Sequence, residues 1–245
     1  MRARLEAIYA AIPDRARRVA DVGYDQGLLI DALLLRRPGV RVVGVERQDA
    51  AAQAYRERHE AELATWGARL ALRTGDGLTA ILPGEVDVAV IAGIGARSVA
   101  RMLRAAPGVL AHLDVIVLCC PRFNGELMPA VADAGLVPLA TRLVRDRDHV
   151  YEVTTAAPTH PHRAPADELA RYYGAPLLDG ADPLALPYLE DVRRTFAPAF
   201  ATGLASYGPL STQPDLGRKL ALLDDAIARA RAAASAGPRA HAAPA

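Results

Sequence analysis

Short apolar runs alternate with stretches of helical periodicity through the first 157 residues of the chain. The apolar runs predict strands at 19–22, 41–46, 70–73, 86–91 and 115–118. Apolar positions three and four residues apart predict helices at 5–12, 28–35, 49–65 (with Asp49 as its N-cap), 96–103 and 125–133. Strands that are apolar throughout belong in sheets covered on both faces. The alternation therefore predicts a doubly wound, Rossmann-like α/β domain with a parallel sheet.

A different pattern begins at residue 136, where two β-rich segments follow one another along the chain. They cover 136–144 and 150–155 and flank the polar sequence Arg145-Asp146-Arg147-Asp148. This spacing is typical of a hairpin, whose two strands are antiparallel. We therefore expect an antiparallel edge hairpin to complete the sheet.

The composition shifts after residue 157, which predicts a division into domains. Residues 1–157 form the α/β domain, and the proline-rich segment 158–165 is interpreted as a linker. Residues 166–232 are expected to form a C-terminal helical, coiled-coil-like appendage, an antiparallel pair of helices at 184–200 and 216–232 joined through 208–214. Residues 233–245, rich in Ala, Pro and Gly, are expected to be disordered.

Composition excludes some classes of protein. The chain has 245 residues and a net charge of +1, so charge alone does not indicate nucleic-acid binding. No apolar run approaches the ~20 residues of a membrane span, and the start has no signal-peptide core, so we expect a cytoplasmic monomer without membrane contact. The only cysteines, Cys119 and Cys120, are adjacent and offer no zinc spacing. We interpret them as small apolar residues and expect no metal.

Acidic residues stand at the ends of three predicted strands. Asp21, Glu46 and Asp76 follow the first, second and third apolar runs. Ligands of doubly wound sheets bind outside the carboxyl ends of the strands, so these carboxylates predict a binding site. Any single one of them is also explained as a helix cap or a turn former, and the nearby glycines as loop or packing residues. The three together favour a ligand site.

The turn after the first strand indicates what kind of ligand binds. Its sequence, Gly23-Tyr24-Asp25-Gln26-Gly27, lacks the third glycine of a dinucleotide-binding turn and carries a carboxylate that would repel phosphate. S-adenosylmethionine fits instead, because its amino and sulfonium groups are cationic. We expect Glu46 to accept the ribose hydroxyls and Asp76 the adenine amine, with Asp21 and Gly23 beneath the methionine part.

These residues lie within a wider resemblance. The chain resembles the bacterial tRNA adenine-22 N1-methyltransferases, the TrmK family, over roughly residues 2–232. The resemblance is carried by Arg4-Leu5-Glu6, Ala20–Asp25, Gly75-Asp76-Gly77-Leu78, Pro83–Asp87 with Ile91–Gly95, His149–Val153, Tyr173–Leu178 and Asp182-Pro183-Leu184. It implies a class I S-adenosylmethionine-dependent methyltransferase fold.

The resemblance also implies a reaction and a set of site residues. Adenine N1 attacks the sulfonium methyl group and S-adenosylhomocysteine leaves, with Asp25 as the catalytic carboxylate beside the cationic product. The cofactor-binding residues implied are Asp21, Gly23, Glu46, Asp76, Gly77, Ala92 and Gly93. The tRNA would contact Tyr24, as a ring holding the flipped base, together with Gln26, Arg4, Arg17, Arg97 and Arg101. Packing explains Tyr24 equally well, and ordinary solvation explains the arginines.

Three segments depart from the family pattern. The family has Ser-Asp-His where this chain has Tyr24-Asp25-Gln26, and Ala-Gly-Met-Gly-Gly where it has Ala92–Ala96. Its Gln-Pro-Asn corresponds to Cys119-Cys120-Pro121. Two alternatives therefore stay open beside a tRNA methyltransferase. One is a catalytically weakened paralogue that binds cofactor and serves as an RNA-binding or interaction protein. The other is a methyltransferase of a small molecule or protein.

Overall fold

The computed structural model describes residues 2–120, 127–158, 182–202 and 216–236, together with Leu169, Tyr173 and Leu178. These residues belong to two compact units, Met1–Ala164 and Pro165–Ala245.

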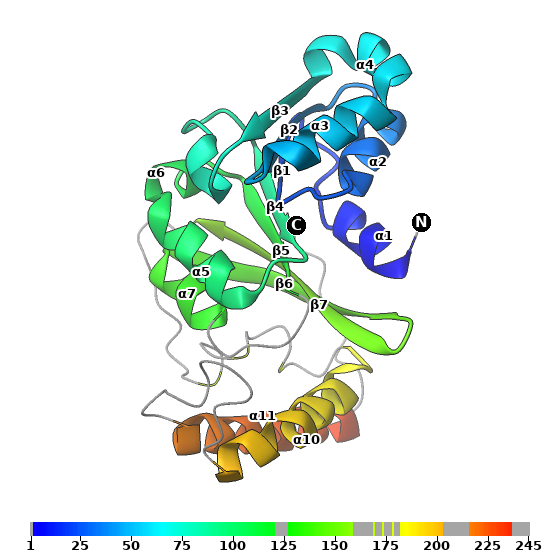
Figure 1. Cartoon of the computed structure of the whole chain (residues 1–245). Coiled ribbons are helices and arrows are strands. Elements are labelled where there is room, and N and C mark those ends of the chain that lie inside the picture. Colours follow the sequence, from blue (N-terminus) through cyan, green and yellow to red (C-terminus); the bar gives the residue numbers. More distant parts are fainter. Residues whose placement is uncertain are drawn as a thin grey trace. The chain divides into compact units, whose positions relative to one another are not determined.

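The first unit is built on a seven-stranded sheet with the order β3-β2-β1-β4-β5-β7-β6 (Figure 1). The strands are β1 (Arg18–Val22), β2 (Arg41–Glu46), β3 (Leu70–Thr74), β4 (Val88–Ala92), β5 (Val115–Cys119), β6 (Leu136–Asp146) and β7 (His149–Pro158). The first five strands pair in parallel, β7 pairs antiparallel to β5, and β6 pairs antiparallel to β7. The prediction of a parallel sheet with an antiparallel edge hairpin is confirmed.

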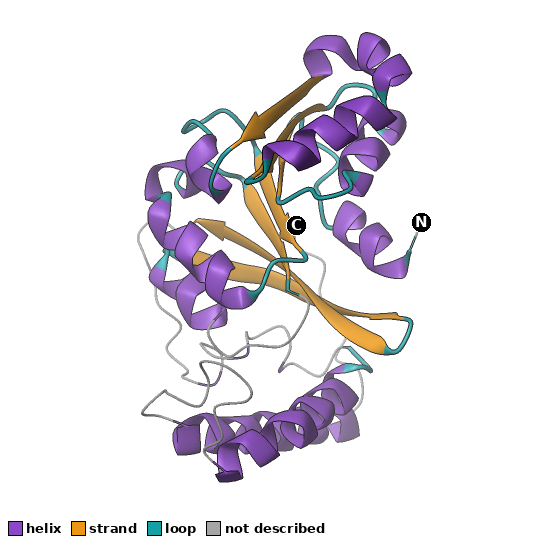
Figure 2. Cartoon of the chain, in the orientation of Figure 1, coloured by secondary structure: helices purple, strands orange, loops and turns teal. Residues whose placement is uncertain are grey.

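Helices cover both faces of this sheet (Figure 2). They are α1 (Ala3–Ala10), α2 (Leu28–Arg36), α3 (Asp49–Arg58), α4 (Glu60–Trp66), α5 (Ala96–Ala105), α6 (Pro107–Leu110) and α7 (Leu127–Asp133), with 3₁₀ turns η1 (Gly67–Arg69) and η2 (Gly77–Ala80). Successive residues of the central strands enter different cores. Ala89 and Ile91 of β4 pack with α5 and α7, whereas Val88 and Val90 pack with α1 and α2. This alternation explains why the strands are apolar at every position.

The helix expected over 49–65 is two helices, and the prediction of one was wrong. The chain leaves helical geometry at His59 (φ −118°, ψ 27°), between α3 and α4. There the imidazole lies against the rings of Tyr55 and Trp66, with centroids 4.5 and 5.2 Å away. Asp49 is the first residue of α3 rather than its N-cap, and its carboxylate accepts a hydrogen bond from the Thr74 hydroxyl. Packing of nearby aromatic side chains at His59 and the long-range contact of Asp49 with Thr74 thus override the local helical pattern.

The second unit contains α10 (Ala185–Thr202) and α11 (Leu216–Ala236). Arg193 of α10 pairs with Asp224 of α11, and Glu190, one turn earlier in α10, pairs with Arg231, which lies later in α11. The two helices therefore run antiparallel, as expected. Their contact buries Leu189, Leu223, Ala226 and Ile227. Residues 233–236, expected in a disordered tail, continue α11. The rest of that tail, the segment joining the helices and nearly all of the expected linker lie outside the described residues. Within the described ranges, every helix is too short or too polar to cross a membrane.

The amino-terminal ends of β1 and β4 are held together by the side chain of Asp87. Its carboxylate accepts hydrogen bonds from the backbone N–H groups of Arg17 and Arg18, both at 2.9 Å. The Arg18 guanidinium adds two more, at 2.9 and 2.5 Å. Burial alone would raise the pKa of Asp87, but these hydrogen bonds outweigh it and lower the pKa below its usual range.

We expect Asp87→Ala to lower the free energy of unfolding by about 2–3 kcal/mol, because it leaves two backbone N–H groups and a guanidinium without their acceptor. The lowered pKa means that this stabilisation is present above the unfolded-state pKa of about 3.9 and is lost as the pH falls through the folded value. Urea denaturation at pH 7 measures the difference. The matched control is Asp114→Ala, which removes an exposed pair with Arg15 at 3.7 Å and should cost under about 0.5 kcal/mol. Equal midpoints for the two variants would contradict the prediction.

Candidate functional site

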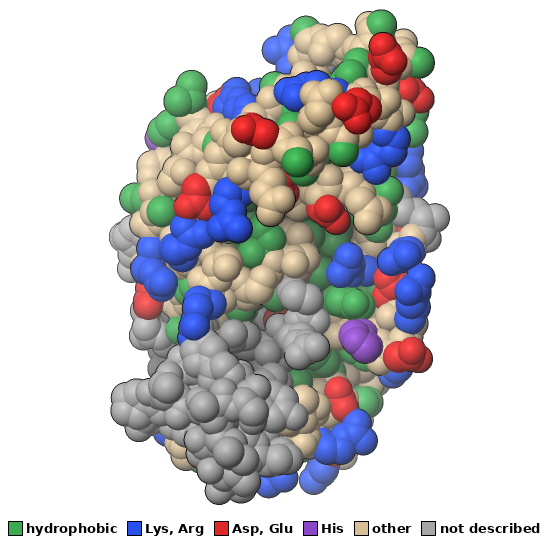
Figure 3. All heavy atoms as spheres, in the orientation of Figure 1, with side chains coloured by type: hydrophobic (Ala, Val, Ile, Leu, Met, Phe, Trp, Pro, Cys, Tyr) green, Lys and Arg blue, Asp and Glu red, His purple; other side chains and the backbone are tan. Residues whose placement is uncertain are grey.

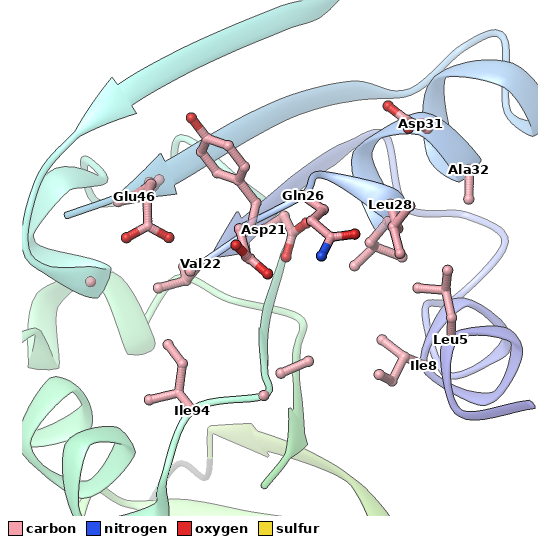
Figure 4. A pocket seen from close by; sticks show the side chains of 18 of the residues that line it. Leu5, Ile8, Asp21, Val22, Gln26, Leu28, Asp31, Ala32, Glu46 and Ile94 are labelled. Carbon is pink, nitrogen blue, oxygen red and sulfur yellow. The ribbon is translucent and has the colours of Figure 1, made fainter. Parts of the chain in front are cut away.

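A cavity of about 1170 Å³ opens at the carboxyl edge of β1, β2, β3 and β4. Its lining includes all three predicted strand-end acids, Asp21, Glu46 and Asp76. Figure 4 shows Asp21 and Glu46 in the cavity, with Ile94 on the opposite wall. The parallel sheet therefore brings together carboxylates that lie far apart along the chain.

Asp21 is the most buried acidic residue of the cavity. The residue is almost completely buried, with 5% of its surface exposed. Burial is the main reason why its pKa rises to about 7, and the negative charges of Glu46 and Asp31 raise it further. A cationic ligand group would relieve both effects, since it would neutralise the carboxylate and offset its lost hydration. The site is thus electrostatically suited to a positive ligand.

The turn after β1 needs glycine for reasons of packing. Gly23 and Gly27 have positive φ angles of 75° and 70°. A Cβ atom at Gly27 would lie 2.1 Å from the Tyr55 ring, and one at Gly23 would lie 2.5 Å from the end of Ile94. Between them, the exposed Asp25 also has a positive φ, 46°, a region that Asp tolerates better than most residues. The bare backbone therefore lets a side chain of α3 close over the turn.

The other two acids already have partners. The Glu46 carboxylate accepts a hydrogen bond from the backbone N–H of Arg47 at 2.7 Å. Asp76 forms a two-point ion pair with Arg101 of α5, with N–O distances of 2.6 and 3.2 Å. The hydrogen bonds from Arg101 lower the pKa of Asp76. A residue predicted to bind cofactor thus contacts a residue predicted to bind RNA.

Tyr24 lies mostly in the core and contributes to the lining of the cavity. The residue is 5% exposed, its ring packs edge-on against Tyr55 with centroids 5.9 Å apart, and it approaches Gly44 of β2. Its hydroxyl has no hydrogen-bond partner among the described residues. This placement favours the packing role over a ring that holds a flipped base. Gln26, by contrast, is exposed and extends into the cavity (Figure 4).

The predicted cofactor residues gather more closely than the predicted RNA residues. Gly23, Gly77, Ala92, Gly93 and Asp25 all line the cavity, as do Arg4 and Arg101, whereas its described lining does not include Arg17 or Arg97. The Arg4 guanidinium lies 4.8 Å from the centre of the Tyr151 ring, which fixes it at the cavity's edge. Figure 3 shows arginine or lysine side chains on both sides of this face, over α5 and over α1.

Sequence reasoning missed the wall that α1 and α2 contribute. Leu5, Ile8, Leu28 and Asp31 line the cavity. Asp31 accepts a 2.7 Å hydrogen bond from the Tyr55 hydroxyl and lies 3.4 Å from Nε2 of His59. Helical periodicity marks α1 and α2 as amphipathic, but it does not show which open space their exposed positions face.

Cys119 and Cys120 are buried, and burial raises the pKa of each thiol to about 12. Un-ionised thiols are poor nucleophiles, which agrees with their interpretation as small apolar residues. In the described segments, no group of three or more His, Cys, Asp or Glu side chains could hold a metal ion.

Comparison with known proteins identifies the family to which the chain belongs. Residues 1–154 match the family model described as a methyltransferase domain, and the chain belongs to that family. No curated protein sequence matches the chain.

Solved structures with the same fold span almost the whole chain. The m1A22 tRNA methyltransferase TrmK of B. subtilis is 19% identical with a TM-score of 0.75, over 93% of this chain and 98% of that one. Sp1610 of Streptococcus pneumoniae, in complex with S-adenosyl-L-methionine, is 20% identical with a TM-score of 0.71, over 94% and 98%. TrmK of M. capricolum, in complex with S-adenosyl-homocysteine, is 14% identical with a TM-score of 0.70, over 93% and 98%. At these identities the likeness is one of fold, and it includes the second unit.

We expect Asp21→Asn to stabilise the protein without ligand at pH 8 by about 2–4 kcal/mol. In the wild type, the folded-state pKa of about 7 lies above the unfolded value of about 3.9. Between these two pH values the folded state binds more protons than the unfolded state, so the stability of the wild type falls as the pH rises. The gain should vanish below about pH 4, where the carboxyl group is neutral in both states. Urea denaturation at pH 8, 6 and 4 measures the trend. The control, Asp25→Asn, changes an exposed carboxylate of the same turn and should follow wild type. An Asp21→Asn variant no more stable than wild type at pH 8 would refute the assigned pKa.

Proposed function

We propose that the protein is an S-adenosylmethionine-dependent RNA methyltransferase that methylates N1 of an adenine in tRNA. The observation that carries the proposal is the convergence of three strand-end carboxylates on one cavity in a chain of the methyltransferase-domain family. The likeness in fold to the m1A22 tRNA methyltransferase TrmK of B. subtilis supports the substrate. The Streptococcus pneumoniae and M. capricolum structures, which hold S-adenosyl-L-methionine and S-adenosyl-homocysteine, support the cofactor.

The residues of the cavity fit S-adenosylmethionine, which would supply a methyl group already activated on a positive sulfur. Asp21 offers a buried anion to the cationic methionine part, and Glu46 offers carboxylate oxygens to the ribose hydroxyls. Asp76 would accept the adenine amine beside Gly77. Gly93 lines the cavity, and a Cβ there would meet no atom within 4 Å, so a larger residue would fill ligand space.

The residues of the chain would position the adenine and stabilise the positive charge that forms on it. N1 of neutral adenine carries a lone pair and no proton, so no general base is needed before it attacks. Methylation leaves the base cationic. The exposed carboxylate of Asp25 lines the cavity and would stabilise that charge. Gln26 can both donate and accept hydrogen bonds at the edge of the base.

The departures from the TrmK pattern are divided between the cavity and the core. The described lining of the cavity includes Tyr24, Gln26 and Ile94 but not Ala96, Cys119 or Cys120. The two cysteines are core residues, so their change alters packing rather than a ligand contact. Pro121 lies outside the described residues. The changes at Cys119 and Cys120 therefore leave the described cavity lining unaltered, whereas Gln26 keeps a polar side chain in it. Both points support a working enzyme, and we propose that its partner is a cytoplasmic tRNA.

We expect the purified full chain to form 1-methyladenosine when incubated with labelled S-adenosylmethionine and total bacterial tRNA. Nucleoside analysis identifies the product. Asp25→Asn should lower kcat on the order of tenfold to a hundredfold, because it removes a charge opposite a developing cation, while cofactor affinity measured by calorimetry stays the same. Glu60→Ala, a change on the exposed surface of α4, is the control. Protein that binds cofactor but leaves tRNA unmethylated would favour the non-catalytic alternative, and a different methylated product would correct the substrate.

We also propose that the second unit contacts RNA and leaves cofactor binding to the first. A chain ending at Ala164, the last residue of the first compact unit, should bind S-adenosylmethionine with wild-type affinity. Its kcat/KM for tRNA should fall by about tenfold or more, since the phosphate contacts that we propose for α10 and α11 would be lost. Circular dichroism checks that the shortened chain is folded. Normal tRNA methylation by a folded 1–164 chain would refute this role.

A further inference from the structure

The cavity is larger than a cofactor site needs to be. Its volume of about 1170 Å³ exceeds the roughly 300–1,000 Å³ of a pocket for one small ligand. Its two ends also differ in chemistry. The acids of β1 and β2 occupy one end, while Leu5 and Ile8 of α1 and Leu28 and Ala32 of α2 gather at the other (Figure 4). The apolar end has no counterpart in the cofactor contacts proposed above.

One face of α2 is apolar and open at this end. Leu28, Ala32 and Leu35 are spaced i, i+4 and i+7, which places them on one side of the helix, and all three line the cavity. Leu28 is 50% exposed and Leu35 is 69% exposed, two of the four large apolar side chains that stand out in this way among the described residues. Exposed leucines that share a concave surface indicate a binding surface rather than chance exposure.

The acidic groups at this end have protein partners. Glu6 accepts hydrogen bonds from Arg36 at 3.1 and 3.2 Å, and Asp31 accepts one from Tyr55. The surface that remains between α1 and α2 is therefore apolar, with the cations of Arg2 and Arg4 also in the lining, of which Arg4 lies beside Tyr151. A flat ligand with apolar faces and a nearby phosphate matches this combination, and a nucleotide has both features.

We propose that the target adenine, turned out of its RNA, enters between α1 and α2 with its faces against Leu28 and Leu5 and its edge at Gln26. This inference rests on the proposed function and adds the place where the acceptor base binds. Leu28 follows the 23–27 turn directly, so a base held there lies next to Asp25 and Gln26. Arg4 is held where it can pair with the phosphate of the extruded nucleotide.

The neighbouring aromatic rings explain why leucines take this role. Tyr24 and Tyr55 are core residues, 5% and 0% exposed. The guanidinium groups of Arg36 and Arg37 lie 4.4 and 4.6 Å from the centre of the Tyr9 ring, and that of Arg4 lies over the Tyr151 ring. The tyrosine faces near this end are thus buried or covered by cations. Apolar side chains can hold a flipped base in place of aromatic ones.

The test is tRNA methylation by Leu28→Ala. We expect kcat/KM for tRNA to fall by about tenfold or more, since even one methylene of an apolar pocket is worth roughly that much, while calorimetry shows unchanged affinity for S-adenosylmethionine. Leu28→Met keeps the apolar area and should retain most of the activity. Leu82→Ala, which shortens a leucine that is 68% exposed and outside the described cavity lining, should match wild type.

The outcomes separate this subsite from the function on which it rests. If wild type methylates tRNA and Leu28→Ala does so with the same kcat/KM, the subsite is refuted and the function stands. If wild type methylates no RNA, the proposed function fails and the subsite falls with it. A loss of cofactor affinity equal to the loss of activity would place Leu28 in the cofactor site and overturn the assignment to the base.

Discussion

A carboxylate held out of water in the middle of a parallel sheet is the constraint on which this site depends. β1 lies between β2 and β4, and Asp21 pairs in register with Gly44 on one side and Val90 on the other. Its position leaves the side chain little access to solvent, and Glu46 adds a second negative charge nearby. Such an arrangement is unfavourable until a cation arrives. A positive ligand group would therefore favour the ionised form of Asp21 and offset the cost of its burial.

The stabilising contacts lie at the opposite end of the same strands. Asp87 and Arg18 hold the amino-terminal ends of β1 and β4 with paired charges and four hydrogen bonds. Two apolar cores cover the faces of the sheet, and the central strands contribute to each in turn. Because the strands are parallel, the mutually repelling carboxylates of Asp21 and Glu46 lie at their carboxyl edge. The ion pair of Asp87 with Arg18 lies at their amino edge. Electrostatic repulsion in the ligand site is thus kept apart from the contacts that stabilise the sheet.

Local patterns predicted most of this architecture from the sequence. The apolar strands, the hairpin around Arg145–Asp148 and the three strand-end acids depend on periodicity and on the rule that parallel strands end at one edge. What the sequence could not show depends on contacts between distant segments. His59, at the helix break, lies 3.4 Å from the Asp31 carboxylate of α2, and Tyr24 is buried because Gly44 leaves room beside it. The open face of α2 appears only once α1 is placed next to it.

The ion pair between Asp76 and Arg101 makes ligand recognition at that carboxylate an exchange of partners. An arriving amine does not meet a free acceptor, because it must displace or share an arginine already bonded at two points. Under the proposed function, the net gain is the difference between two contacts of the same carboxylate, so Asp76 would add little to affinity. A base that lacks the amine would leave the ion pair with Arg101 unchanged. Asp76 would therefore contribute more to selecting the base than to holding it, most clearly at low ionic strength, where the exposed ion pair is screened least.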